Sequence, residues 1–204
     1  VLPSESKLYG ALWAGHYADA QNHGYGWLIS VDLAQRQGRV IPIDGGPLSL
    51  DASADGRRLY VGAEWPAPPN LGNILALDTE TDTVVGSIDF SKLPGPNCFT
   101  EVPDLQIDPA NPRTLYAISG DANALISADL SNLTFREAVF FNDESLHAHF
   151  FVRRPGDASG YILIREAPYA FQLDVDRAVI QRVLKLPSYP GDLAINEAGR
   201  FLIA

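Results

Sequence analysis

The strongest constraint on the fold is a pattern that occurs four times along the 204-residue chain. In each copy a short apolar run ends in an aspartate and leads into a polar turn. The aspartates, spaced by 46, 51 and 45 residues, are Asp32, Asp78, Asp129 and Asp174. Self-similarity at a period of about 20–50 residues marks repeated supersecondary units, so the period takes precedence over any single motif.

Three further strand-like runs accompany each of these aspartates. One run precedes it, at 8–9, 59–61, 115–118 and 161–164, and one follows it, at 39–43, 83–88, 136–141 and 181–186. Another opens the unit, at 48–50, 105–107, 147–149 and 193–195. Short apolar or alternating runs separated by turns predict strands. Four strands in about fifty residues, repeated, predict an all-β fold of four-stranded antiparallel blades, a β-propeller.

The turn residues agree with this interpretation. Asp55-Gly56 can supply the positive φ of a tight hairpin, and Asn111-Pro112 stands at the same joint of the next unit. Each repeated aspartate can accept hydrogen bonds from the amides of the turn that follows it. No segment shows a convincing amphipathic helical pattern.

The units predict a single domain with a partial blade at 1–47, blades at about 48–104, 105–146 and 147–190, and a partial blade at 191–204. Closing these units into a four-bladed ring would put two equivalent strands in one blade. An open arc would expose unpaired strand edges and apolar faces. We therefore expect a truncated part of a larger propeller, with the missing blades on the C-terminal side.

Composition excludes several kinds of partner. Lys and Arg number 15 against 25 Asp and Glu, a formal charge of −10, which argues against nucleic acid and anionic membranes. No apolar stretch approaches the roughly 20 residues of a membrane span, and no signal peptide is visible. The single cysteine excludes an internal disulfide and a multi-cysteine zinc site.

The aspartate-terminated repeat is similar to the broad class of YVTN-like propellers. The stretches GRVIPIDGG at 38–46 and ADGRRLYV at 54–61 resemble more closely the heavy chain of bacterial tryptophylquinone amine dehydrogenases, of the methylamine and aromatic-amine types. That resemblance implies a seven-bladed propeller whose quinone cofactor and catalytic residue lie on a separate, disulfide-rich light chain. It therefore implies no catalytic residue, no cofactor and no metal on this chain.

The resemblance also implies one site and a cellular setting. The family's substrate channel is lined by an aromatic residue in a loop that corresponds to Gly15-His16-Tyr17-Ala18 here, so Tyr17 and its neighbour His16 are the candidate channel residues. The two cysteines of the family's intrachain disulfide are absent near Ser145 and Arg165, which favours a divergent relative. The implied partners are the light chain and a soluble electron acceptor, a copper protein or cytochrome, in the periplasm.

Aromatic residues gather in two long loops that the repeat places on one face of the molecule. Trp13 and Trp27 bracket the first loop, and Trp65 begins the second. Aromatic anchors on a rigid scaffold suit a partner surface, so Trp13 and Trp65 are candidate interface residues. Packing between blades explains the same residues equally well.

Other candidate sites are weaker. His147 and His149 share one face of a strand, yet no third metal ligand is obvious. Residues 51–56 begin like a calcium loop, but Gly62 stands where the bidentate Glu is required. Cys98 has no obvious His partner and is interpreted as an apolar filler.

Two alternatives to the amine dehydrogenase subunit remain. One is a stand-alone YVTN-like propeller that acts as a binding or scaffold module. The other is a metal-dependent propeller hydrolase of the lactonase type, which needs Glu, Asn and Asp where the opening strands here carry Leu48, Leu105, His147 and Leu193. The sequence does not separate the first alternative from the amine dehydrogenase subunit.

Overall fold

The computed structural model describes residues 2, 6–13, 25–64, 74–90, 101–120, 123–141, 148–154, 156–164, 167–191, 193–195 and 201–203. Every regular element within these ranges is a β-strand. The described part contains no helix long and apolar enough to cross a membrane. The expectation of an all-β chain is confirmed.

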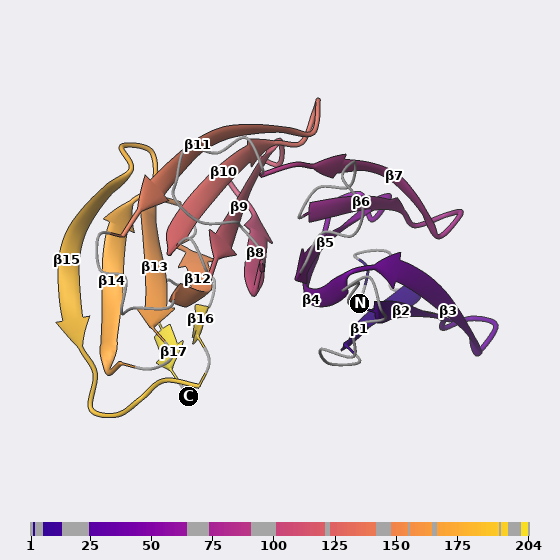
Figure 1. The fold of residues 1–204 in the computed structure, drawn as a ribbon, viewed down its shortest axis with the longest axis horizontal. Coiled ribbons are helices and arrows are strands. Elements are labelled where there is room, and N and C mark those ends of the chain that lie inside the picture. Colours follow the sequence, from indigo (N-terminus) through magenta and orange to yellow (C-terminus); the bar gives the residue numbers. More distant parts are fainter. Residues whose placement is uncertain are drawn as a thin grey trace, which may run out of the picture.

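The strands form five consecutive antiparallel sheets (Figure 1). The first has three strands, β1 (Lys7–Trp13), β2 (Tyr25–Asp32) and β3 (Gln37–Asp44). The second has β4 (Gly46–Ala52), β5 (Arg58–Glu64), β6 (Ile74–Asp78) and β7 (Thr83–Ile88). The third has β8 (Asp104–Ile107), β9 (Thr114–Ser119), β10 (Ala124–Asp129) and β11 (Thr134–Phe140). The fourth has β12 (Ala148–Arg153), β13 (Ser159–Ile164), β14 (Tyr169–Asp174) and β15 (Val179–Lys185), and the last has β16 (Leu193–Ile195) and β17 (Phe201–Ile203).

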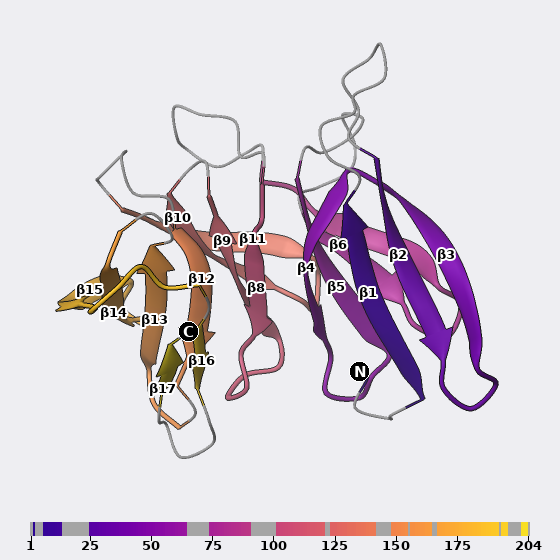
Figure 2. The ribbon, with the colours of Figure 1, turned by 90° about the horizontal axis from the view of Figure 1, so that it is seen from below.

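The sheets follow one another around an arc as the blades of a propeller do (Figures 1 and 2). In each four-stranded sheet the strands lie in chain order, and the opening strands β4, β8 and β12 lie beside one another at the inner side of the arc. One apolar cluster fills each of three successive junctions between sheets. Burial of these facing side chains removes apolar surface from water and holds each blade against the next.

The opening strand of the fourth sheet differs from its sequence-based range. The apolar run 147–149 predicted a strand there, whereas β12 spans Ala148–Arg153 and contains a register shift between Ala148 and Phe150. The shift breaks the two-residue alternation that the prediction relied on.

The turn after each repeated aspartate has the predicted chemistry. The side chains of Asp32, Asp78, Asp129 and Asp174 each accept a hydrogen bond from a backbone N–H two or three residues on. The last residue of each turn adopts a left-handed φ of 54–56°, although none of the four is glycine: Arg36, Asp82, Leu133 and Ala178. Gly56 takes the positive φ of the hairpin between β4 and β5, as expected.

One of these turns makes stability depend on acid pH. The Ser131 hydroxyl and then the Arg136 guanidinium hold the pKa of Asp129 at about 2, below its ordinary 3.8. A carboxyl whose pKa is lower in the folded state adds stability above its unfolded pKa, and that stability is lost as pH falls through the folded value. We expect the urea midpoint of the wild type to fall more steeply between pH 4 and pH 2 than that of Asp129→Asn. Parallel profiles would contradict this assignment.

Candidate functional site

The residues that the sequence proposed for a channel and an interface lie almost entirely outside the described part of the chain. His16, Tyr17 and Trp65 are outside it, and Trp13 is described only as the last residue of β1. The channel and interface assignments therefore stay predictions.

The histidine pair is described only in part. His147 lies outside the described residues, and His149 in β12 has its ring 6.1 Å from that of Phe150. Within the described ranges, no group of three or more His, Cys, Asp or Glu side chains is arranged to hold a metal.

The feature that most resembles an interaction site is one face of the first sheet. Side chains alternate along its strands, so that Tyr9, Leu28, Ile41 and Ile43 pack against the second sheet and are buried. The opposite face, called the outer face below, is apolar and exposed; its most exposed members are Leu8, Leu12, Ile29 and Val40. In the view of Figure 2 no strand is drawn in front of β1, β2 and β3.

Equivalent positions in the second sheet show that such a face is normally covered. Leu8 precedes Tyr9 as Leu59 precedes Tyr60, and Leu8 is 40% exposed whereas Leu59 is 3% exposed. Ile29 stands three residues before Asp32 as Leu75 stands before Asp78, and these two side chains are 38% and 2% exposed. A contiguous apolar surface of this kind marks an interaction site in a soluble protein.

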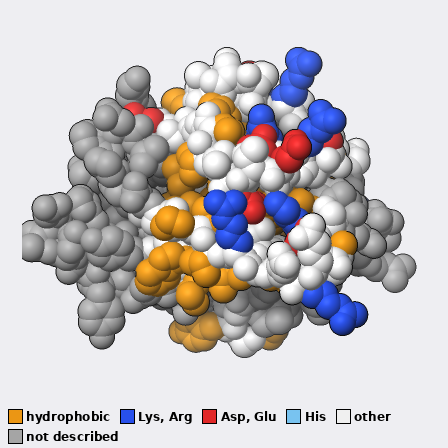
Figure 3. Space-filling view, turned by 90° about the vertical axis from the view of Figure 1, so that its right-hand side faces the viewer, with side chains coloured by type: hydrophobic (Ala, Val, Ile, Leu, Met, Phe, Trp, Pro, Cys, Tyr) orange, Lys and Arg blue, Asp and Glu red, His pale blue; other side chains and the backbone are white. Residues whose placement is uncertain are grey.

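Positive charge borders the apolar side chains on this side of the molecule. Figure 3 faces the side on which β3 lies in Figure 1 and shows hydrophobic side chains close to Lys and Arg side chains. Arg36, at the end of the turn before β3, is exposed, and the Arg39 side chain is 63% exposed. The chain as a whole is acidic, so this cationic border is a local feature that can select a partner by charge.

The inner edge of the same sheet is a second open surface. The strands β5, β9 and β13 each pair on one side with an opening strand, β4, β8 and β12. Their equivalent in the first sheet, β1, pairs only with β2 among the described strands. β1 lies beside β4, so this edge runs along the junction between the first two sheets.

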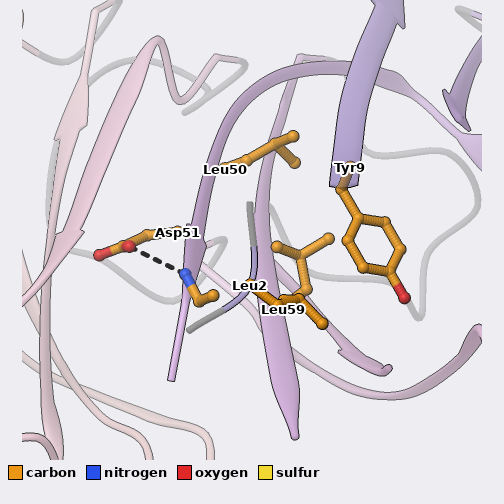
Figure 4. A pocket seen from close by; sticks show the side chains of 6 residues that line it. Leu2, Tyr9, Leu50, Asp51 and Leu59 are labelled. Atoms are coloured by element: carbon orange, nitrogen blue, oxygen red, sulfur yellow. Dashed lines mark hydrogen bonds between the residues drawn. The ribbon is translucent and has the colours of Figure 1, made fainter. Parts of the chain in front are cut away.

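A pocket of about 180 Å³ lies at this junction. Its walls are Leu2, Tyr9, Leu50, Ala52 and Leu59, together with the stem of Asp51. Figure 4 shows the leucines gathered together, with the Asp51 carboxylate turned away from them toward the backbone N–H of Ala52. The pocket is therefore apolar inside, with a carboxylate at its border.

A tyrosine occupies the same position in each second strand and lies at each junction. Tyr9, Tyr60, Tyr116 and Tyr161 each pair with the residue two places before the repeated aspartate, and all four are buried. Burial raises the pKa of Tyr60 and Tyr116. These tyrosines therefore stay protonated and act as hydrogen-bond donors or packing groups.

The first tyrosine joins a polar cluster between the first two sheets. The Tyr9 hydroxyl donates to Asp82 Oδ1 and to the Thr79 carbonyl, and the Lys7 Nζ donates to the same two groups. Burial and the bond to Asp82 raise the pKa of Tyr9. Asp82 thus receives a phenol and an ammonium from the preceding sheet, which fixes the relative position of the two blades.

Removing this phenol is expected to weaken the junction modestly. In Tyr9→Phe the Thr79 carbonyl and Asp82 keep the Lys7 ammonium as a donor, so the free energy of unfolding should fall by about 1 kcal/mol. Chemical denaturation measures the change, with Tyr169→Phe, at an exposed tyrosine, as the control. Equal effects of the two substitutions would show that the Tyr9 hydroxyl does not join the sheets.

The junction between the third and fourth sheets contains a buried ion pair. Arg153, at the end of β12, is 6% exposed and binds Asp108, which is 2% exposed. The Arg153 guanidinium also donates to the Tyr116 hydroxyl at 3.0 Å and lies over the Tyr116 ring. This cation and the Tyr9 cluster are both structural links, since each contacts only groups of the chain itself in the described structure.

Opening strands are joined to one another through side-chain acceptors. Asp51 in β4 accepts from the N–H of Ile107 in β8, and Gln106 in β8 accepts from the N–H of Arg153 in β12. Both acceptors lie opposite the buried tyrosine of their own sheet, since Asp51 pairs with Tyr60 and Gln106 with Tyr116. Burial raises the pKa of Asp51.

Sequence reasoning missed these linking residues. The tyrosines stood in the strand-like runs used to find the repeat, and their recurrence at one register was the signal that identifies them. Asp82 and Arg153 carry no such signal, because their counterparts in the other turns and strands are different residues.

Comparison with known proteins supports the fold alone. No family model matches the chain, and no curated protein matches its sequence. Among solved structures, Kuenenia stuttgartiensis hydrazine synthase matches with a TM-score of 0.67 at 13% identity, over 89% of this chain and 52% of that one. The β-propeller domain of Myceliophteria thermophila Cps50 (Swd1) matches with a TM-score of 0.65 at 15% identity, over 89% and 57%.

A third match is dihydro-heme d1 dehydrogenase NirN in complex with DHE, with a TM-score of 0.63 at 13% identity, over 91% of this chain and 40% of that one. The chain thus spans about half the length of the structures it matches, and at these identities the likeness extends to the fold only. The four-stranded antiparallel blades and these matches together show that the chain has a β-propeller fold.

Proposed function

We propose that this chain is a β-propeller binding or scaffold module that joins a protein partner through the outer face of its first sheet. The observation that carries the proposal is the exposure of Leu8 and Ile29 at positions that are buried in the next sheet. Covering an apolar sheet face of this kind provides the driving force for association. The cationic border at Arg36 and Arg39 favours an acidic rim on the partner.

Substitution of one outer-face residue tests this function. Ile29→Lys puts a charge in the middle of the face, and Val84→Lys, at an equally exposed valine on β7, is the matched control. The proposal expects Ile29→Lys to lower the fluorescence of a bound apolar dye and to lose the proteins that co-purify with the wild type in near-stoichiometric amount. If Ile29→Lys and Val84→Lys retain the same proteins, the outer face is not the binding surface.

A more specific function rests on the resemblance of the stretches 38–46 and 54–61. In that form the chain is the non-catalytic heavy chain of a periplasmic quinone-dependent amine dehydrogenase. The light chain would carry the tryptophylquinone, and a copper protein or cytochrome would accept its electrons. Tyr17 and His16 would line the substrate channel, and Trp13 and Trp65 would contact the light chain.

Co-purification decides this more specific function. A small chain that stains for redox-cycling quinone, recovered with the propeller from its natural source, would support it. In such a complex Tyr17→Ala should change the ratio of kcat/KM between large and small amines. A propeller isolated with partners that carry no quinone would leave the binding module and remove the dehydrogenase subunit.

A further inference from the structure

The inner edge of β1 has the geometry of a binding site for one more strand. The backbone N–H of Leu33, after β2, donates to the Ser6 carbonyl, so the carbonyls and amides of Ser6, Leu8 and Gly10 are directed toward β2. By the two-residue alternation of a strand, Tyr9 and Ala11 direct theirs to the opposite edge. No described strand pairs with that edge.

The three other blades show what such an edge binds. β5, β9 and β13 each receive an opening strand there, and the residue after that strand donates its N–H back across the hairpin. These donations run from Ser53 to Arg58, from Asp108 to Thr114 and from Arg154 to Ser159. Leu2 donates to Lys7 in the same way, so Leu2 stands where an opening strand would end.

The junction also contains the receiving groups for the side chains of that strand. In the second and third sheets, the residue opposite the buried tyrosine is Asp51 or Gln106, and its side chain accepts from the next opening strand. The N–H equivalent to those of Ile107 and Arg153 is that of Ala52, which here donates to the Asp51 side chain of its own strand. The apolar pocket lies beside it, lined by Leu50, Leu59 and the Tyr9 ring.

From these observations we infer that the edge of β1 binds an extended polypeptide strand, antiparallel to β1 and ending beside Leu2. Its backbone pairs with the N–H and C=O groups of Tyr9 and Ala11. An apolar side chain enters the pocket, and an Asp or Gln opposite Tyr9 accepts from the Ala52 N–H. The inference deepens the proposed function and rests on it, because it names the kind of segment that the module binds at a second surface.

A peptide titration tests the site directly. The probe is the capped synthetic peptide GPLSLD, the sequence of residues 46–51, which places its aspartate opposite Tyr9 when bound as β4 binds to β5. In amide-resolved NMR of the whole chain we expect saturable shifts at Tyr9, Ala11 and Ala52. A peptide with Ala in place of its aspartate should bind about tenfold more weakly, since one hydrogen bond to a carboxylate is lost.

A substitution in β1 supplies the matched control. Ala11→Pro removes one N–H from the open edge and leaves the pairing with β2, because proline is tolerated where its missing N–H faces away from the sheet. It should weaken peptide binding at least tenfold while the thermal midpoint stays close to that of Ala11→Ser, which should bind as the wild type does. Shifts spread over other strands, or equal binding by Ala11→Pro and Ala11→Ser at equal stability, would overturn the inference.

The two proposals fail separately. Ile29→Lys changes the outer face and leaves the backbone edge of β1 intact, so it should lose protein partners and keep the peptide. If the peptide does not bind while the wild type still recovers partners that Ile29→Lys loses, the strand site is wrong and the binding module stands.

Discussion

Arg153→Ala is expected to lower the free energy of unfolding by about 3–5 kcal/mol, because it leaves a buried carboxylate without its cation. Asp108 is 2% exposed and has Arg153 as its ion-pair partner at the junction between the third and fourth sheets. The same substitution removes the donor to the Tyr116 hydroxyl and the cation over its ring. Urea denaturation followed by tryptophan fluorescence and by circular dichroism measures the change.

The neighbouring arginine provides the control. Arg154 pairs with Asp157 at 3.3 Å, and both side chains are about 42–43% exposed, so Arg154→Ala should cost less than about 1 kcal/mol. The double variant Arg153→Met with Asp108→Leu should recover most of the lost stability, since it removes both charges together. Equal costs for Arg153→Ala and Arg154→Ala would show that the buried pair does not hold the two sheets together.

Phe90→Ala is expected to cost about 3–5 kcal/mol through a cavity between the second and third sheets. Phe90 follows β7, is fully buried, and belongs to the cluster that contains Ile88 of the second sheet and Ile126 of the third. The flanking sheets are held by their own hydrogen bonds and can collapse into the space only in part, so the cavity persists.

The matched control is Phe140→Ala at the end of β11, where the ring is 37% exposed. Its cost should stay within about 1 kcal/mol, because removing a partly exposed ring opens no enclosed cavity. The two variants are compared by their denaturant midpoints at constant slope. A loss at Phe140 as large as that at Phe90 would contradict the assignment of Phe90 to the core between the blades.

The repeat predicted the fold well because its information is local. Short apolar runs, turn residues and the aspartate that ends each third strand are read from a few neighbouring residues. The hydrogen bonds of Asp78 and Asp129 to the turns that follow them span two or three residues. Local chemistry of this kind does not depend on which other sheet lies nearby.

Register irregularities were beyond the same reasoning. The strand β12 begins with a shift between Ala148 and Phe150, so the run 147–149 marked its start and not its length. A bulge changes which side chains face the core without a distinctive residue to announce it.

The candidate surfaces came from the tertiary structure. Leu8 and Leu59 stand in nearly identical runs, yet one is exposed and the other buried, because only the second has a neighbouring sheet on that side among the described residues. A sequence pattern states that a face is apolar and does not state whether another sheet covers it.

By itself, then, the sequence determined the four-stranded unit, its turns, its aspartates and the alternation that gives each sheet two apolar faces. The tertiary structure alone decided which residues join the blades. Tyr9 and Asp82 are 73 residues apart in the chain, and Arg153 and Asp108 are 45 apart. Such pairs meet only when successive sheets stack, and their identities differ from junction to junction, so no repeat in the sequence marks them.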